Sequence, residues 1–410
     1  MTLAGTVTSI NWIMRRIFIV AAAVILFITM AGCAPVEETA PEKSQPESDL
    51  QETSPESPDT SEKDEDYPKI ASWLAKKDEI ISSGKSWDLV MSGWFTPEEA
   101  GKIREQNPDV KILAGLSVNW VWDNADWKKF LLTVASYGRE TPFVITDEMY
   151  LRDSGGERCA FGWASDSWGH EEIYAMDPRS AEWAELITSF YGMVIEQPQH
   201  DGIIVDMVLE KSLCPGAISD EELVEATRKI IAGIDRVNTG NKLVIFNSGR
   251  ELGEIDAYGE FMDGYLIENF MGDQLQLGFS EGLKALDDDY MVIYAVDTDD
   301  TGVKDMGKMR LGLVLSLLGD NAFFTYDFGP RDHGQAWWFE EYDVKLGQPL
   351  GEYYKKGETY FREFKRGMVV ASPDSEVTVS FDEELRDSTT GEKSDSFRIA
   401  AGDGRIYLRE

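Results

Sequence analysis

Two stretches of the chain share one design: "DGIIVDMV" at residues 201–208 and "DGYLIENF" at residues 263–270. In each, Asp-Gly precedes a short apolar run that an acid ends, Asp206 in the first stretch and Glu268 in the second. A β-branched run such as residues 203–205 is typical of a buried strand. We therefore expect both carboxylates at the point where a buried strand reaches solvent or substrate.

Eight such apolar runs alternate with helical stretches from residue 68 onward. Near-continuous apolar runs are typical of parallel strands covered on both faces. The alternation predicts an α/β protein with a (β/α)₈ TIM barrel. A doubly wound open sheet is the alternative, although no GxGxxG loop follows the first run. The runs are "KIASWL" (69–74), "DLVMSG" (88–93), "KILAGLSV" (111–118), "GIIVDMV" (202–208), "KLVIFNSG" (242–249), "GYLIENF" (264–270), "MVIYAVD" (291–297) and "AFFTYDFG" (322–329).

Two of the intervening helices carry readable ends. Ser219 and Glu222 have the spacing of a capping box, and we expect that helix to end at Gly240. In "DPRSAEWAELITSFYGMVIEQ" we expect Asp177 as the N-cap and Pro178 as the first helical residue.

The interval between the third and fourth runs is too long for a single helix. It spans roughly 90 residues and contains "PFVITDEMYL" and "RDSGGERCAFGWASDSWGH". We expect a long structured insertion in the third βα loop, at the end of the barrel where functional loops gather. The alternative is that "FVITDEMYL" is a barrel strand and "KIASWL" is not.

The two acids have a physical role to play in such a barrel. The C-terminal ends of all its strands face one mouth, and Asp206 would end the fourth strand and Glu268 the sixth. With strands about 4.8 Å apart, the carboxylates could approach within about 5–9 Å, which covers retaining and inverting glycoside cleavage. One carboxyl would keep its proton for the leaving oxygen, and the other would stay ionised as nucleophile or as base for water.

A family resemblance rests on the same motifs. "DGIIVD" and "DGYLIEN", with the tail "GQPLGEYYKKGETYFREFKRGMVVASP" at residues 347–373, resemble glycoside hydrolases related to the endo-α-1,4-polygalactosaminidases. The similarity covers most of residues 68–373. It implies a barrel in which Asp206 and Glu268 are catalytic, with no metal and no cofactor.

Further residues at or after the expected strand ends are candidates for substrate binding. Aromatic faces can stack on a sugar ring, although core packing is the alternative for any single Trp. Arg152 could hold an anionic or amide group, and Asp147 and Glu148 are rival acids. The aromatic candidates are Trp94, Trp120, Trp122, Trp163, Trp168, Trp337 and Trp338, and the polar ones are Asp147, Arg152, Asn247, Asp297, Tyr326 and Asp327.

Motifs of other enzyme classes are missing from the sequence. His170, His200 and His333 show no HxH or HExxH spacing, which disfavours zinc. No Gly-x-Ser-x-Gly elbow is present, which disfavours an esterase. A glycosidase acting on a poly- or oligosaccharide is therefore favoured. The alternatives are a catalytically inactive glycan-binding barrel, and another hydrolase or lyase that would need a metal or a Ser/His pair.

The N-terminal segment is typical of export rather than of the fold. In "MRRIFIVAAAVILFITMAGC" (14–33), two arginines precede an apolar run that ends at Cys33. The small residues before Cys33 resemble the lipobox of bacterial lipoproteins, with Met30 where Leu is usual. An uncleaved anchor over residues 17–32 is the alternative. In either case we expect an exported, membrane-tethered protein that faces the outside or the periplasm, with lipid on Cys33 in the first.

Composition divides the chain into parts. The formal net charge of −36 argues against nucleic acid and is consistent with solubility. Residues 34–67 hold twelve acids and two lysines and predict a flexible tether. We expect a signal at 1–33, this tether, a barrel at 68–360 and a small β appendage at 361–410 built from "GMVVASP", "EVTVSF", "SFRIAAG" and "GRIYLRE". We expect a monomer.

With Cys33 assigned to lipid, Cys159 and Cys214 remain as an even pair in an exported chain. They follow the third and fourth strands, which are neighbours in a barrel, and this predicts a Cys159–Cys214 disulfide. In the chain-entropy model the loop it closes is worth about 4 kcal/mol. Two free thiols are the alternative.

Overall fold

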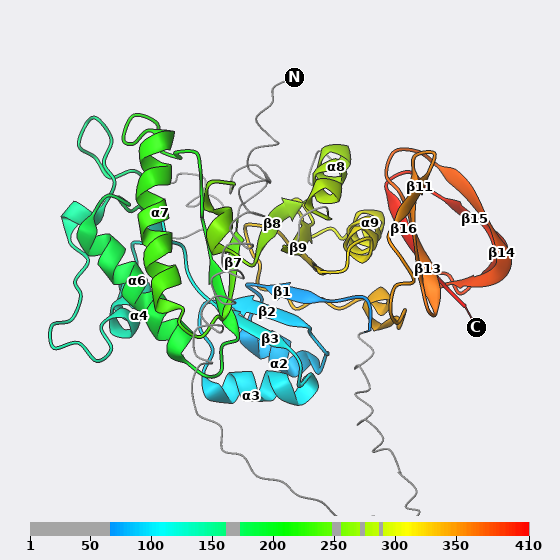
Figure 1. The fold of residues 1–410 in the computed structure, drawn as a ribbon, viewed down its shortest axis with the longest axis horizontal. Helices are drawn as coiled ribbons and strands as arrows, with labels where there is room; N and C mark the ends of the chain where they lie inside the picture. Colours follow the sequence, from blue (N-terminus) through cyan, green and yellow to red (C-terminus); the bar gives the residue numbers. More distant parts are fainter. Residues whose placement is uncertain (1–65, 161–172, 248–255, 271–274, 287–289, 410) are drawn as a thin grey trace, which may run out of the picture. The chain divides into compact units, whose positions relative to one another are not determined.

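The computed structural model describes residues 66–160, 173–247, 256–270, 275–286 and 290–409. Eight parallel strands form one sheet, and a parallel bridge between Ile70 and Phe324 joins its first and last strands into a barrel (Figure 1). All eight predicted runs supply a strand, whereas "FVITDEMYL" supplies none. In spatial order the strands are β1 (Ala71–Trp73), β2 (Leu89–Ser92), β3 (Lys111–Ala114), β6 (Gly202–Val205), β7 (Leu243–Asn247), β8 (Gly264–Phe270), β9 (Met291–Asp297) and β10 (Ala322–Asp327).

Alternate side chains of each strand fill the barrel interior, and the others face the helices. Every strand contributes to the interior apolar cluster. Each fully buried Leu, Ile, Met or Phe side chain contributes about 1.5–3 kcal/mol to the stability of the fold. Outward-facing residues such as Val205, Ile267 and Phe324 belong to the larger cluster shared with the helices. The interior cluster comprises Ala71, Trp73, Leu89, Met91, Leu113, Ile204, Ile245, Leu266, Ile293, Ala295 and Phe323.

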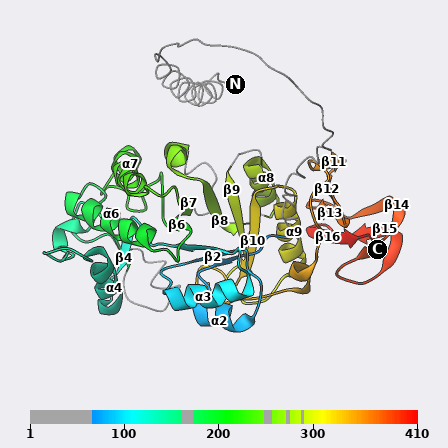
Figure 2. The ribbon, with the colours of Figure 1, turned by 60° about the horizontal axis from the view of Figure 1, so that its bottom comes forward.

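Helices cover the outside of the barrel, and Figure 2 shows α6 and α7 side by side next to β6 and β7. In the described parts of the connections after β7 and β10, only the 3-10 helices η3 (Asp256–Phe261) and η4 (Glu340–Asp343) occur. The barrel thus departs from a regular alternation at these two places. The covering helices are α2 (Lys77–Ser83), α3 (Pro97–Gln106), α6 (Ala181–Glu196), α7 (Asp220–Val237), α8 (Leu275–Leu286) and α9 (Met306–Leu317).

Helix α6 begins later than the sequence predicts. Its N-cap is Ser180, whose side chain accepts a hydrogen bond from the Trp183 N–H at 3.2 Å. The assignment of Asp177 as N-cap and Pro178 as first helical residue was wrong. The carboxylate of Asp177 instead accepts from the backbone and the guanidinium of Arg179, so it closes a turn before the helix.

Helix α7 begins as predicted and ends early. Ser219 and Glu222 form the capping box, with both reciprocal hydrogen bonds present. The C-cap is Asn238 rather than Gly240, and its side-chain amide donates to the Lys242 carbonyl. A polar side chain thus ends the helix where the sequence pattern pointed to a glycine.

The long interval after β3 is a structured insertion, as predicted. It contains β4 (Trp120–Trp122), α4 (Ala125–Ala135), η1 (Asp147–Met149) and β5 (Ile173–Ala175), and β4 and β5 pair antiparallel. Strands β3 and β6 pair directly across it. The insertion therefore adds to one end of the barrel without interrupting the barrel sheet.

The C-terminal part forms a six-stranded antiparallel sheet in the order β11-β12-β13-β16-β14-β15. The four predicted strands are present, but the sequence missed β11 and β12. The sheet therefore begins at Tyr354, within the range assigned to the barrel. The strands are β11 (Tyr354–Lys356), β12 (Thr359–Phe364), β13 (Gly367–Ser372), β14 (Val377–Asp387), β15 (Lys393–Ile399) and β16 (Asp403–Leu408).

This sheet packs on α9, which lies between β9 and β16 in Figure 1. The guanidinium of Arg310 on α9 donates two hydrogen bonds, each 2.9 Å long, to the carboxylate of Asp403. At the next residue, Gly404, a Cβ atom would lie 2.5 Å from the carbonyl oxygen of Arg310. The close approach of strand to helix therefore depends on glycine at this position.

We predict that Gly404→Ala lowers the free energy of unfolding by about 1–3 kcal/mol, because the added methyl group must push β16 away from α9. Urea unfolding measures the change. Gly351→Ala is the matched control, because a Cβ there meets nothing within 4 Å, and we expect a change within about 0.5 kcal/mol. Equal stability of the two variants would contradict this account of the packing.

Candidate active site

A layer of polar side chains lies directly above the interior apolar cluster, at the C-terminal ends of the strands. Each member is two residues beyond an interior apolar or polar residue of its strand, so it faces the same way. Ile204 leads to Asp206, for example, and Leu266 leads to Glu268. The members are Asp206, Asn247, Glu268, Asp297 and Asp327.

The structure brings Asp206 and Glu268 together through Asn247. The amide nitrogen Nδ2 of buried Asn247 donates to Asp206 Oδ1 at 2.8 Å and to Glu268 Oε2 at 3.0 Å. Since the two N–H bonds of an amide diverge by about 120°, ideal hydrogen-bond geometry would place these two oxygens about 5 Å apart. Asn247 was a candidate for substrate binding in the sequence, and in the structure its amide bridges the two acids.

Glu268 is held as an ion. Its Oε1 accepts from Trp73 Nε1 at 3.1 Å and from His333 Nε2 at 2.8 Å, and its side chain is 20% exposed. Burial by itself raises the pKa of Glu268. The hydrogen bond and positive charge of His333 oppose burial, and with the N–H groups of Asn247 and Trp73 they lower this pKa to about 2.

The pKa of Asp206 is shifted in the opposite direction. Burial, and then the negative charge of Glu268, raise the pKa of Asp206 to about 7, against the N–H groups of Asn247 and Met207. The backbone around Asp206 is fixed by the insertion: its N–H donates to the Leu116 carbonyl at 3.1 Å, and its carbonyl accepts from Val118. The two carboxyls therefore differ in protonation near neutral pH.

Two contributors to the site escaped the sequence analysis. Trp73 ends β1 and reaches Glu268 across 195 residues of chain. His333 lies in the loop after β10, where its Nδ1 is 2.8 Å from Asp327 Oδ2. Trp73 ends one of the predicted strands, as the acids do, and this was the available signal. His333 follows no strand directly and matched no metal-binding spacing.

The remaining members of the polar layer are buried carboxyls. Asp327 lies at hydrogen-bond distance from His333. Asp297 accepts from the Asp299 N–H and lies 3.8 Å from Lys308 Nζ. Burial raises the pKa of Asp297 to about 6. Within the described ranges, no group of three or more His, Cys, Asp or Glu side chains is arranged to hold a metal ion.

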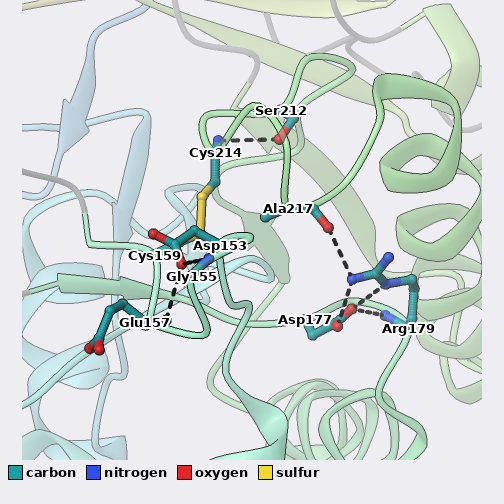
Figure 3. Close-up of a disulfide and its surroundings, with 9 residues drawn as sticks. All are labelled: Asp153, Gly155, Glu157, Cys159, Asp177, Arg179, Ser212, Cys214 and Ala217. Carbon is teal, nitrogen blue, oxygen red and sulfur yellow. Dashed lines mark hydrogen bonds and ion pairs between the residues drawn. A yellow bond between two sulfur atoms is a disulfide. The ribbon is translucent and has the colours of Figure 1, made fainter.

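A disulfide joins Cys159 to Cys214, the pair that the sequence predicted, with their Cα atoms 6.2 Å apart (Figure 3). Cys159 belongs to the insertion and Cys214 to the loop that follows Asp206. In the insertion, Asn119 Nδ2 also donates to the Met207 carbonyl at 2.7 Å. Met207 has a φ of 56°, in the left-handed region that a non-glycine residue rarely adopts. The insertion thus fixes the strained turn next to Asp206.

Several proposed substrate-binding residues have other places in the structure. Trp120 is buried in the core of the insertion, and Tyr326 faces the helix side of the barrel, where its hydroxyl accepts from the Asp305 N–H. The ring of Trp94 packs edge-on against the ring of His200. Trp120 and Tyr326 are therefore buried, whereas Trp94 is half-buried and follows the C-terminal end of β2.

The charged and aromatic candidates in the loops also contact other side chains. Arg152 and Arg158 both pair with Asp147 on the exposed surface of the insertion. Trp337 packs against Tyr326. The rings of Trp122 and Trp338 contact other tryptophans. Trp163, Trp168, His170 and Cys33 lie outside the described residues.

Glycoside hydrolases on TIM barrels carry such a pair of carboxyls at the mouth. The chain belongs to hypothetical glycosyl hydrolase family 15, whose model matches residues 104–368. Fold and family together make it a glycoside hydrolase. A comparison with curated proteins found no match.

Solved structures with a similar arrangement were also found. The glycoside hydrolase domain of PelA from Pseudomonas aeruginosa is 13% identical, with a TM-score of 0.42 over 64% of this chain and 96% of that domain. The galactosidase domain of the α-galactosidase–sucrose kinase AgaSK is 12% identical, with a TM-score of 0.46 over 83% of this chain and 54% of that one. A variant of the GH36 α-galactosidase AgaA from Geobacillus stearothermophilus is 12% identical, with a TM-score of 0.46 over 84% of this chain and 56% of that one.

Proposed function

We propose that this glycoside hydrolase cleaves a poly- or oligosaccharide with retention of configuration, with Glu268 as nucleophile and Asp206 as acid and base. The observation that carries the proposal is the Asn247 amide, whose Nδ2 lies 2.8 Å from Asp206 Oδ1 and 3.0 Å from Glu268 Oε2. With ideal amide geometry these two distances correspond to about 5 Å between the two carboxyl oxygens. Retaining enzymes have carboxyls about 5–5.5 Å apart, while inverting enzymes need about 6.5–9.5 Å to admit a water.

The division of roles follows from the protonation of the two acids. Asp206, with its pKa raised to about 7 by burial, keeps a proton in mildly acidic solution and gives it to the leaving glycosidic oxygen. Ionised Glu268 attacks the anomeric carbon and forms a glycosyl ester. The Asp206 carboxylate then takes a proton from the water that attacks this ester, which restores both acids.

Within Glu268 the two oxygens have different tasks. Oε1 accepts from both Trp73 and His333, whereas among the described residues Oε2 accepts from Asn247 alone. Oε2 therefore has a lone pair available for the sugar. The donors to Oε1 hold the carboxylate in place during the attack.

The full chain should release reducing ends from at least one member of a panel of amino-sugar and neutral polysaccharides. We predict that Asp206→Asn and Glu268→Gln each lower kcat by about a hundred- to ten-thousandfold, since each removes a group that acts in the reaction. Glu98→Gln is the control, because Glu98 lies on the surface of α3 and pairs with Lys102, and its activity should match the wild type.

Two further results test the roles themselves. Proton NMR of the first product should show retained anomeric configuration. Azide should rescue Glu268→Ala by forming a glycosyl azide of inverted configuration, because azide occupies the place of the lost nucleophile. Glycan binding without turnover by the wild type, or near-normal turnover by either acid variant, would overturn the proposal.

The pH dependence of kcat/KM should report the same acids in the free enzyme. Asp206 must be protonated to act, so activity should fall about tenfold per unit as pH rises beyond its pKa of about 7. Glu268 must be ionised, so the acid limb should lie far lower, toward its pKa of about 2. A profile that stays flat up to about pH 9 would exclude Asp206 as the proton donor.

We also propose that the chain is exported and anchored to the membrane by lipid on Cys33. The support is the sequence of residues 14–33, with two arginines, an apolar run and small residues before the cysteine. Among the described residues, no helix is long and apolar enough to cross a bilayer.

In a bacterial host, Cys33→Ala should move the protein from the membrane fraction to the soluble fraction, or leave the signal uncleaved, because no acceptor for lipid remains. Fractionation followed by mass measurement of the N-terminus distinguishes these outcomes. A variant that is still processed and still bound to the membrane would favour a plain anchor.

A further inference from the structure

His333 is a buried ring between two carboxylates, and the mechanism above uses only its hydrogen bond to Glu268. It is 8% exposed, and Asp327 beside it is 3% exposed. Its Nδ1 lies 2.8 Å from Asp327 Oδ2, and its Nε2 lies 2.8 Å from Glu268 Oε1. Both ring nitrogens therefore face an acceptor at hydrogen-bond distance.

The number of hydrogens on the ring follows from these partners. A neutral imidazole has a single N–H, whereas two acceptors require the two N–H groups of an imidazolium. A neutral ring would make the same two contacts only if Glu268 or Asp327 carried the proton in its place. Against a proton on Glu268, the Trp73 N–H and the Asn247 amide also donate to this carboxyl, and these donors favour its ionised form. The arrangement is satisfied when the ring is cationic and Glu268 is ionised.

His200 provides an internal comparison, since it is also a buried histidine. Its Nε2 accepts from the Phe95 N–H at 3.2 Å, and its Nδ1 lies 3.1 Å from the Val194 carbonyl oxygen. One acceptor and one donor match the neutral ring. Burial accordingly lowers the pKa of His200.

We propose that His333 is a buried imidazolium that positions Glu268 and keeps it ionised, so that the proton of the catalytic pair rests on Asp206. The inference deepens the proposed function and depends on it for its catalytic meaning. His333 is a positioning residue, because it acts on the reaction through Glu268. Asp327 in turn supplies the charge that keeps the ring cationic inside the barrel.

The charges around the ring support this assignment. Burial alone lowers the pKa of His333, but Asp327 and Glu268 together raise it well above its ordinary value of 6.5. Asp206, directly after β6, is the next acid, and the charge of His333 opposes the rise of its pKa. Beyond Asp327 lies Asp297 of β9, which is paired with Lys308 of α9.

The protonation of His333 can be measured without any substrate. The chain has three histidines, so nitrogen-15 labelling of histidine in the full chain gives few signals, and His333→Gln identifies the one of interest. We expect both ring nitrogens of His333 to stay protonated at about pH 8, where an ordinary histidine is neutral. His200 should be neutral in the same spectrum. A His333 that titrates at or below 6.5 would overturn the inference.

Asp327→Asn tests the source of the effect while keeping the ring in place. The amide oxygen of the new side chain can still accept from Nδ1, but the negative charge is lost. We expect the pKa of His333 to fall by at least about one unit. An unchanged titration would remove Asp327 from the proposal, and with it the reason for a cation at this depth.

Kinetics test whether the cation acts on Glu268. In His333→Gln the pKa of Glu268 should rise, so the acid limb of kcat/KM should move up by at least about one pH unit, with a larger effect on kcat than on KM. His200→Gln should leave both limbs in place. An acid limb that does not move in His333→Gln would refute a positioning role.

These readouts separate the inference from the proposed function. A cationic His333 in a chain that cleaves no glycan would contradict the function and leave the protonation assignment intact. An active enzyme whose His333 is neutral at about pH 8 would contradict the inference and leave the function intact.

Discussion

The two-residue repeat of side-chain direction in the barrel strands is the constraint on which the site depends. Ile204, Ile245 and Leu266 fill the interior, and the residue two positions further on each strand faces the same way, in β8 just where its register against β9 shifts after Ile267. Polar groups at those positions therefore meet in one layer above an apolar floor. The floor excludes water from below, which strengthens every charge interaction in the layer above it. A register slip of one residue in any of these strands would turn its polar group toward the helices.

Within that layer, donors and acceptors are arranged so that neighbouring carboxyls do not behave alike. Glu268 accepts from Trp73, Asn247 and His333, while Asp206 gains fewer donors and feels the charge of Glu268. Two acids about 5 Å apart in similar surroundings would share one proton without preference. The unequal supply of donors makes one of them a stable anion and the other an acid near neutral pH.

The insertion after β3 supports the side of the site that has fewer donors. Leu116 and Val118 hydrogen-bond the backbone of Asp206, Asn119 bonds Met207, and the disulfide joins Cys214 to the insertion. The left-handed conformation of Met207 is costly for a non-glycine residue and persists only where neighbours fix it. Asp206 is therefore held from outside its own strand, whereas Glu268 is held by groups inside the barrel.

The sequence by itself determined the eight strands, the insertion, the two acids and the cysteine pair, because each depends on a local pattern or on neighbouring strands. Buried parallel strands read as apolar runs, and an acid that ends such a run stands out. Only the tertiary structure showed which of these aromatic side chains contacts an acid of the pair: Trp73 reaches Glu268, while Trp120 and Tyr326 pack into apolar clusters. Residues that follow apolar runs look alike in sequence, because the face of the strand on which each lies determines whether its side chain points into the barrel or toward the helices. His333 could not be found from the sequence, because its significance lies in its contacts with Asp327 and Glu268. Only the folding of the chain brings this ring to Glu268.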